Sequence, residues 1–233
     1  MAVVAGGISS AIVSAAATVS WTHTPGATDT LVIASISLDF GGSGFSATYD
    51  GVAMTLIDGS GSAPAALMWY REIAEGGGAK TVAISWTTAR SGYAGAASYN
   101  GRRTVAAGGL GTAVTTTGSS AAPAVTVVGE VNGRVHGCAA QAGIFDSDAG
   151  MTRIYLTYAA GAAHDDGAVS AVMTWGTDTS TGWRTVGIAI NPISVGDRII
   201  WYMSTAGWGD KLRDIFAPKN GILQPRELGL VTI

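Results

Sequence analysis

Three histidines are the first residues of this sequence whose chemistry could serve catalysis or metal binding: His23, His136 and His164. None of them has the spacing of an H-E-x-x-H or a comparable metal motif. We expect His23, which precedes a strand-like run, to make a local hydrogen bond. His136 follows Arg134 by two residues on a predicted strand, so both side chains point to one face, which we expect to be partly exposed.

Two acidic clusters have the composition of cation-binding loops. The run His164-Asp165-Asp166-Gly167 could bind a cation through carboxylate and main-chain oxygens. The run Asp146-Ser147-Asp148 has the D-x-D spacing of calcium loops, but it lacks the glycine and the distal glutamate of an EF-hand. We favour a solvated hairpin turn for the first cluster and a turn for the second. We therefore expect no bound metal and no cofactor.

Carboxylates and serines are not arranged as in the common hydrolases. A glycoside hydrolase needs two carboxylates that face each other across a cleft, and nothing in the spacing of the four glutamates pairs them. The sequence has no G-x-S-x-G nucleophile elbow. The glycine-rich segments 41–44 and 76–78 lack the Lys-Ser/Thr pair of a phosphate loop, and we expect them to be flexible connections. We therefore expect that the protein is not an enzyme. The glutamates are Glu72, Glu75, Glu130 and Glu227.

Short β-like runs, separated by Gly, Ser, Asn and Asp, must position these residues. Asp50-Gly51 and Asn100-Gly101 are turn signals between such runs. Many short strands at regular spacing predict an all-β, jelly-roll-like antiparallel sandwich and not a parallel sheet with crossover helices. Residues 105–124 are typical of a surface connection between two halves of the sandwich, with an extended edge segment. The predicted strands are 30–38, 46–49, 52–57, 67–71, 80–86, 93–99, 125–131, 133–139, 153–158, 168–175 and 183–190.

The composition limits the possible partners. Charged residues make up only 12% of 233 residues, about half the usual share, so little charge is available to cover an exposed surface. Such a surface is either rich in Ser, Thr and Gly or covered by partners, and the second possibility indicates assembly. The net charge of −3 and the absence of a basic patch argue against nucleic-acid binding.

No segment has the sequence of a membrane span or of a complete export signal. The longest apolar stretches fall short of the roughly 18 residues that a span requires. The apolar segment 1–19 lacks a positively charged start, so we do not expect a signal peptide. Cys138 is the only cysteine, which excludes an intrachain disulfide, and we expect it to be a buried, inert thiol.

The sequence changes character after Pro192, where charged and large apolar residues become denser. We predict a sandwich domain over residues 1–192, with an N-terminal edge segment over 1–18, and a C-terminal arm over 193–233. The arm either packs on its own domain or reaches a neighbouring subunit. Five tryptophans are expected in the core: Trp21, Trp69, Trp86, Trp175 and Trp183. The expected partner-binding residues lie in the arm: Trp201, Tyr202, Trp208, Leu212, Ile215 and Phe216.

The order of several short motifs resembles jelly-roll-like β-sandwich domains of tailed-bacteriophage virion proteins and of some bacterial surface proteins. The resemblance covers about Val19 to Pro192. It implies a sandwich that builds or decorates a particle, and it supplies no catalytic motif. The motifs are Trp21-Thr22-His23-Thr24, Thr48-Tyr49-Asp50-Gly51-Val52-Ala53-Met54, Trp69-Tyr70, Lys80-Thr81-Val82-Ala83-Ile84-Ser85-Trp86, Ala97-Ser98-Tyr99-Asn100-Gly101, Gly182-Trp183 and Gly187-Ile188-Ala189-Ile190-Asn191-Pro192.

Our leading hypothesis is a structural protein of a virion, either a head decoration or minor capsid protein or a tail component. It would form homo-oligomers and contact other virion proteins, with no nucleic acid or membrane as a partner. The alternative is a carbohydrate-binding, cell-surface adhesion module, which predicts a groove with exposed Trp or Tyr, with a host surface glycan as ligand. A hydrolase with an unrecognised site is the third and weakest alternative.

Overall fold

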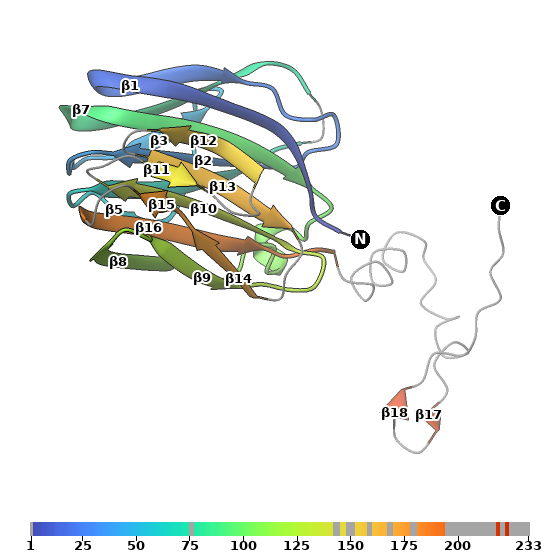
Figure 1. Cartoon of the computed structure of the whole chain (residues 1–233). Helices are drawn as coiled ribbons and strands as arrows, with labels where there is room; N and C mark the ends of the chain where they lie inside the picture. The colour runs from blue at the N-terminus through green and yellow to red at the C-terminus, as the bar shows by residue number, and fades with distance from the viewer. Residues whose placement is uncertain are drawn as a thin grey trace. The chain divides into compact units, whose positions relative to one another are not determined.

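The computed structural model describes residues 2–74, 77–141, 145–147, 152–157, 160–166, 170–177, 181–193, 218–219 and 222–223. Strands and their connections account for these residues, apart from one turn of 3-10 helix at Val105–Ala107. Every strand pair is antiparallel, so the prediction of an all-β antiparallel fold is confirmed (Figure 1). The Cα positions divide the chain into two units, Met1–Ile193 and Ser194–Ile233.

The first half of the larger unit forms one seven-stranded sheet, in which β1 pairs with β7 beside the path β4-β3-β7-β2-β6-β5. The hairpin turn predicted at Asp50-Gly51 is confirmed, because the two residues join the paired strands β3 and β4, and both have positive φ angles, 52° and 75°, as in a type I′ turn. The strands are β1 (Val4–His23), β2 (Leu31–Leu38), β3 (Ser46–Tyr49), β4 (Val52–Ala53), β5 (Thr55–Ser60), β6 (Ala65–Glu72) and β7 (Lys80–Asn100).

The second half forms a five-stranded sheet in the order β12-β13-β10-β16-β8, with the smaller pairs β14-β9 and β11-β15 beside it. β8 lies at the edge of the five-stranded sheet, as expected for the extended segment within residues 105–124. The strands are β8 (Val114–Ser120), β9 (Ala124–Val128), β10 (Arg134–Gln141), β11 (Phe145–Ser147), β12 (Thr152–Thr157), β13 (Ala160–Asp166), β14 (Ser170–Thr174), β15 (Gly176–Thr177) and β16 (Thr181–Ile190).

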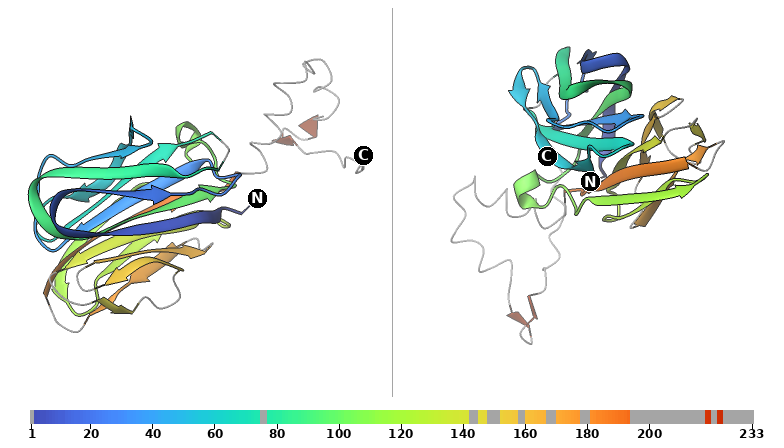
Figure 2. Two further views of the ribbon diagram at one scale, coloured as in Figure 1. Left: turned by 90° about the horizontal axis from the view of Figure 1, so that it is seen from above. Right: turned by 90° about the vertical axis from the view of Figure 1, so that its left-hand side faces the viewer.

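The two halves pack face to face, as the end-on view of Figure 2 shows, with the blue and cyan strands on one side and the lime to orange strands on the other. All eight residues of β2 are buried, because alternate side chains enter different cores. Val32 and Ile36 point into an N-terminal core, whereas Leu31 and Ile33 point into a central core between the halves. A continuous apolar run such as Leu31–Leu38 is typical of a strand that is covered on both faces.

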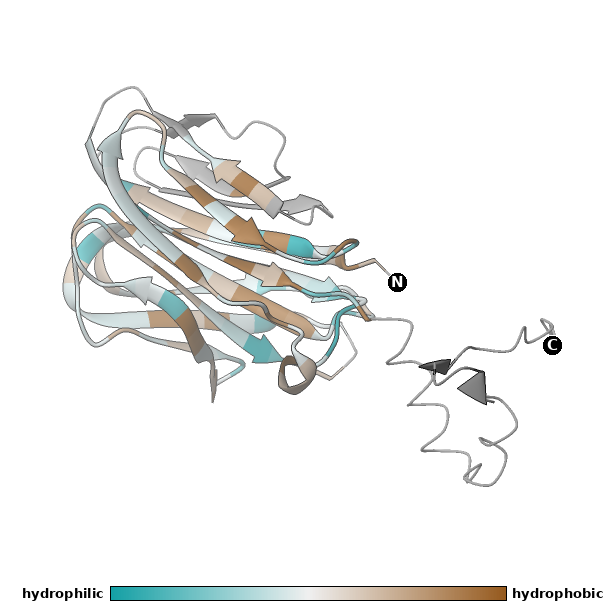
Figure 3. Cartoon of the chain, turned by 90° about the horizontal axis from the view of Figure 1, so that it is seen from below, coloured by the Kyte–Doolittle hydropathy of each residue, from teal (hydrophilic) through white to brown (hydrophobic). Residues whose placement is uncertain are grey.

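The sheet of the second half is also covered on both faces. In β10, Cys138 belongs to the central core, whereas Val135 and Ala139 belong to a C-terminal core beneath β9 and β14. Cys138 is fully buried, as predicted, and this burial raises the pKa of its thiol. Figure 3 shows hydrophobic residues along the inner strands and few strongly hydrophilic residues on this unit.

β1 and β7 form a long ribbon that bends back on itself. The N-terminal part of β1 pairs with residues 92–100 of β7, and its C-terminal part pairs with residues 80–85. The register shifts between Val13 and Thr18, where Ala15 has a φ angle of 45°. The ribbon therefore passes from the sheet layer of β2 to the layer of β3 and closes the N-terminal core between them.

Two predicted turns are wrong. His164, Asp165 and Asp166 form the end of β13 and pair with β10, so this segment is a strand up to Asp166. Asp146 and Ser147 lie in β11, which pairs with β15. In both places cross-strand hydrogen bonding outweighs the local preference of polar residues for turns.

The smaller unit contributes one described hairpin pair, β17 (Pro218–Lys219) with β18 (Ile222–Leu223). The helical segment that the sequence suggested at 211–216 lies outside the described residues, as does most of the predicted arm. In the portion of the chain that is described, we find no helix with the length and apolar character needed to cross a bilayer.

Candidate binding surfaces

His23 lies where the two arms of the bent ribbon meet. Its Nδ1 atom lies 2.9 Å from Ser9 Oγ, and the same hydroxyl accepts a hydrogen bond from Trp21 Nε1 at 2.9 Å. The predicted hydrogen bond of His23 is therefore present but not local, because its partner lies fourteen residues away. His23 is fully buried, and burial lowers the pKa of its imidazole to about 4, although the nearby Asp29 carboxylate acts in the opposite direction.

Asp29 is a fully buried carboxylate beside this histidine. It accepts hydrogen bonds from Gly26 N at 2.6 Å, Ser98 Oγ at 2.5 Å and Asn100 Nδ2 at 3.2 Å. These donors surround the charge in place of water, as burial of a carboxylate requires. Gly6 is necessary next to it, because a Cβ atom there would lie 1.9 Å from an Asp29 oxygen.

These residues do not have the arrangement of a serine nucleophile. In a catalytic triad the carboxylate binds the second ring nitrogen of the histidine. Here Asp29 binds Ser98 and main-chain groups, and His23 Nε2 has no hydrogen-bond partner among the described residues. The pair Ser9–His23 also lies outside the hollow described below. The geometry instead ties the two arms of the ribbon together.

His136 occupies the central core and not a partly exposed face, so that prediction is wrong. It is fully buried, and its Nδ1 lies 2.7 Å from Tyr99 Oη. The rings meet edge to face with centroids 6.0 Å apart. Burial raises the pKa of Tyr99. Position 136 shares a strand face with Cys138, which packs in the central core between the two sheets, and this covers the face that we expected to be open.

Arg102 and Arg103 join the two halves of the unit. Arg102 Nη1 lies 2.7 Å from Glu72 Oε1, and Arg103 pairs with Glu130 of the second half. Burial alone would raise the pKa of Glu72, but hydrogen bonds from Val105 N and Arg102 hold it below its usual value. Two of the glutamates that sequence spacing left unpaired are thus structural ion partners.

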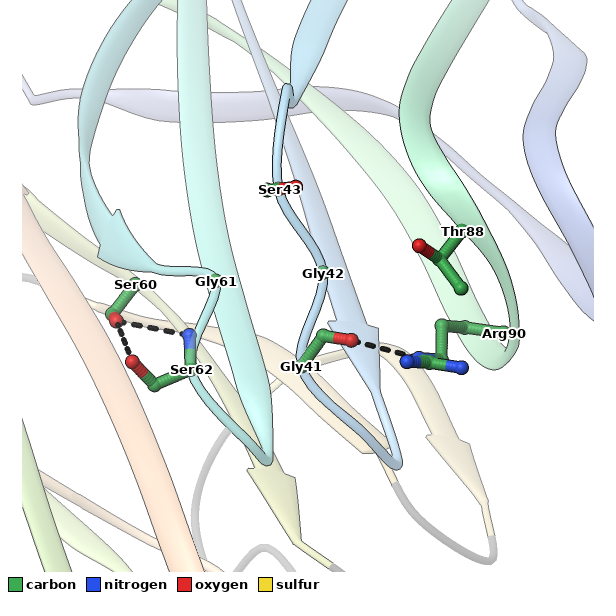
Figure 4. A pocket seen from close by; sticks show the side chains of 8 residues that line it. All are labelled: Gly41, Gly42, Ser43, Ser60, Gly61, Ser62, Thr88 and Arg90. Atoms are coloured by element: carbon green, nitrogen blue, oxygen red, sulfur yellow. Dashed lines mark hydrogen bonds between the residues drawn. The ribbon is translucent and has the colours of Figure 1, made fainter.

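A hollow of about 580 Å³ opens at one end of the first half (Figure 4). Three connections line it: the loop after β2, the loop after β5 and the bend of β7. Arg90 reaches across from the bend and donates its Nε–H to Gly41 O at 2.7 Å. The sequence indicated only flexible glycine-rich segments here. The lining residues are Gly41, Gly42, Ser43, Ser60, Gly61, Ser62, Thr88 and Arg90.

β1 presents an uncharged edge. It pairs with β7 on one side and has no strand partner on the other among the residues that the structure describes. No Asp, Glu, Lys or Arg occurs between Val4 and His23. The pairing with β7 is regular from Ile8 to Val13. In this part, Ile8 and Ile12 are 41% and 67% exposed, and they lie opposite Ala97 and Tyr93 of β7. Natural edge strands are commonly protected by charge, proline or a covering segment, and β1 has neither charge nor proline here.

A second uncharged surface covers the outer face of the pair β9–β14. Val128 and Val172 are 70% and 60% exposed, and Val172 lies directly opposite Thr126. Thr126 and Thr174, which are also exposed, add hydroxyl groups to this face but no charge. The described unit therefore has two uncharged surfaces with exposed aliphatic side chains.

The remaining site predictions have mixed outcomes. Trp69, Trp86 and Trp175 are buried, as predicted, whereas Trp21 and Trp183 are only partly buried. Among the described residues, no three His, Cys, Asp or Glu side chains gather in a way that could hold a metal ion. The six predicted partner-binding residues lie outside the described residues: Trp201, Tyr202, Trp208, Leu212, Ile215 and Phe216.

No protein-family model and no curated protein matches the sequence. Among solved structures, the PBSX exported protein XepA has a TM-score of 0.29 and 12% sequence identity, over 80% of this chain and 86% of XepA. The STIV MCP has a TM-score of 0.23 and 10% identity, over 86% of this chain and 99% of that protein. With TM-scores below 0.5, neither likeness defines the fold or the function of this chain.

Proposed function

We propose that this protein is a structural component of a bacteriophage virion, a head decoration, minor capsid or tail protein, and acts by subunit assembly without catalysis. The observation that carries the proposal is the uncharged edge of β1 with its exposed Ile8 and Ile12. A free edge of this kind is a template for a further strand. The sequence resemblance to virion sandwich domains favours the same function.

The edge suits a second copy of the chain as its partner. Ile8, Ser10 and Ile12 alternate with residues that face the N-terminal core, so the outward pattern is symmetric about Ser10. Antiparallel pairing of two copies would place Ile8 of one copy opposite Ile12 of the other. Because the strand carries no charge, no like charges would meet in such an isologous contact.

The C-terminal arm would supply a second contact, to a neighbouring subunit or to another virion protein. Its six large apolar side chains from Trp201 to Phe216 have the composition of interface anchors. The larger unit ends beside the start of the β1 edge, since Ile193 N donates to Gly101 O and Val4 pairs with Asn100.

The mass of the full chain in solution, measured by sedimentation equilibrium over a range of concentrations, tests this function. We expect a defined oligomer for the natural chain and a lower mass for the double variant Ile8→Lys, Ile12→Lys, because charge at an edge opposes strand addition. The matched control is Val128→Lys, Val172→Lys on the other uncharged face, with far-UV circular dichroism to verify folding. If the natural chain is monomeric at all concentrations, self-assembly is wrong.

A chain that ends at Ile193 separates the contribution of the arm. If the arm contributes to assembly, this chain keeps its fold but forms a smaller or weaker oligomer than the full chain. An unchanged oligomer would assign self-assembly to the sandwich alone and refute the role of the six arm residues in it.

A further inference from the structure

The hollow at the end of the first half is built from main chain and hydroxyls. Gly42 N donates to Gly61 O at 2.7 Å, so the two loops lie in direct backbone contact. A Cβ atom at Gly61 would lie 2.4 Å from Gly42 O, and one at Gly41 would lie 2.7 Å from Gly61 O. Only glycine permits this approach. The floor of the hollow is therefore main chain, and the Phe45 ring packs against its Gly42 and Gly61.

Arg90 brings a positive charge to this floor without a carboxylate partner. Its Nε donates to Gly41 O and its Nη1 donates to Ala89 O at 3.1 Å, which fixes the plane of the guanidinium. No carboxylate of the described residues forms an ion pair with it, in contrast to Arg102 and Arg103. Arg90 Nη2 has no partner among the described residues. A guanidinium oriented by neutral acceptors is a site for an anionic group.

The other polar groups of the hollow are hydroxyls. Ser60 and Ser62 lie on one side of the Gly41 carbonyl and Arg90 on the other (Figure 4). Ser43 and Thr88 supply two more hydroxyls from the other two connections. A hydroxyl both donates and accepts hydrogen bonds, so it matches the hydroxyl groups of a sugar. Phe40, which precedes Gly41, is 59% exposed and adds an aromatic ring to the same loop.

From these features we infer that the hollow binds an acidic saccharide, a sugar that carries a carboxylate or phosphate group. Arg90 would hold the anionic group, and the serine and threonine hydroxyls would hold the sugar hydroxyls. The volume of about 580 Å³ lies in the range of about 300 to 1,000 Å³ that is usual for small-molecule sites. Arg90 is the one charged residue among the described residues that line the hollow, whereas nucleic acids are held by several cations along their phosphate backbone. The hollow therefore does not suit a nucleic acid. The inference does not depend on the proposed assembly function.

Isothermal titration of the full chain with a disaccharide that contains one glucuronate tests the inference. The matched ligand has glucose in place of glucuronate. We expect binding of the acidic disaccharide, weakening with salt, and at least about tenfold weaker binding of the neutral one, since the charge-assisted hydrogen bonds to Arg90 are lost. Acetate and inorganic phosphate serve as simple anions, which should bind more weakly than the acidic disaccharide because they do not reach the hydroxyls.

Two variants locate the site. Arg90→Gln should weaken binding about tenfold or more, whereas Arg71→Gln, an arginine bonded to Ala53 O and remote from the lining residues, should not change it. Thr88→Trp fills the hollow from an exposed position and should abolish binding while Arg90 stays intact. Thermal melting verifies that each variant folds. Absent binding, equal binding of the neutral ligand or of acetate, or an unchanged affinity in Arg90→Gln and Thr88→Trp would overturn the inference.

Discussion

Ser9 Oγ lies 2.9 Å from His23 Nδ1, although the two residues are fourteen positions apart in the same strand. A straight strand would hold these residues about 46 Å apart at about 3.3 Å per residue. The contact is therefore possible only because β1 and its partner β7 bend together near Ala15. The Ser9–His23 hydrogen bond can therefore form only when the ribbon is bent over the N-terminal core.

The stability of the protein should depend on the protonation of His23. Its pKa is about 4 in the folded chain and about 6.5 in the unfolded chain. Between these two pH values the unfolded state takes up a proton on His23 that the folded state does not, and this favours unfolding. The contribution of neutral His23 is fully present above pH 6.5 and is lost as the pH falls toward 4. We expect a loss on the order of 2 to 3 kcal/mol between pH 7.5 and 4.5. Urea unfolding at several pH values measures it.

The variant His23→Gln separates this effect from the carboxylates that titrate in the same range. It keeps a polar group near Ser9 but cannot take up a proton. We expect lower stability than the natural chain at pH 7.5 and a smaller decrease toward pH 4.5. Parallel curves for the two proteins would show that His23 does not carry the acid sensitivity.

The buried carboxylate of Asp29 should be essential for the stability of the ribbon. In Asp29→Asn, an amide group would face donors such as Gly26 N and Ser98 Oγ. We expect a loss of about 1.5 to 3 kcal/mol in the free energy of unfolding, typical for hydrogen bonds to a charged group. Asp39→Asn is the matched control, because Asp39 accepts only the N–H of the next residue and should lose less than about 0.5 kcal/mol. Similar losses in both variants would contradict this role.

Local sequence patterns predicted most strands but not their long-range partners. The run of β2 and the alternation of Val82, Ile84 and Trp86 gave the correct elements, because burial on one or both faces leaves a periodic trace in the sequence. The expected strands 80–86 and 93–99 are one strand, β7. Residues 87–92 end in the turn-type dipeptide Ser91-Gly92, but Arg90 and Gly92 still pair with β1, and this pairing continues the strand through the bend.

The candidate sites could be predicted less well, because they depend on distant pairing. Nothing near His23 in the sequence identifies Ser9 as its partner, and the burial of His136 follows from a sheet that packs over its face. The hollow depends on the contacts Gly42–Gly61 and Arg90–Gly41 between three connections, which no single segment encodes. The one sequence feature that marked the hollow was the high glycine content of residues 41–44, which we interpreted as a flexible connection.

Close packing between the five-stranded sheet and β9 should make Gly187 intolerant of a side chain. A Cβ atom there would lie 2.6 Å from Val127 Cγ2 and 3.1 Å from Val125 Cγ1. Gly187→Ala should therefore cost about 1 to 3 kcal/mol through overpacking. The double variant with Val127→Ala should recover part of this loss, because it removes the atom that the new methyl group meets.

Gly182→Ala, in the same strand, controls for any general effect of a methyl group. No atom lies within 4 Å of a Cβ at Gly182, so we expect no loss or a small gain in stability. Strictly additive losses in the double variant, measured by urea unfolding, would contradict direct contact between residues 187 and 127.

The bend of the ribbon gives the last prediction. Ala15 is exposed and has a φ angle of 45°, in the left-handed region where a Cβ atom costs roughly 1 to 2 kcal/mol. Ala15→Gly removes this cost, partly offset by the greater freedom of glycine when unfolded, so we expect unchanged or slightly higher stability. Ala15→Val should lose at least about 1 kcal/mol, because a β-branched residue tolerates this conformation least. Ser14→Val, at an exposed neighbour without a positive φ angle, should change little. An equal response at positions 14 and 15 in thermal unfolding would mean that the chain does not turn at Ala15, and the Ser9–His23 contact would then lose its geometric basis.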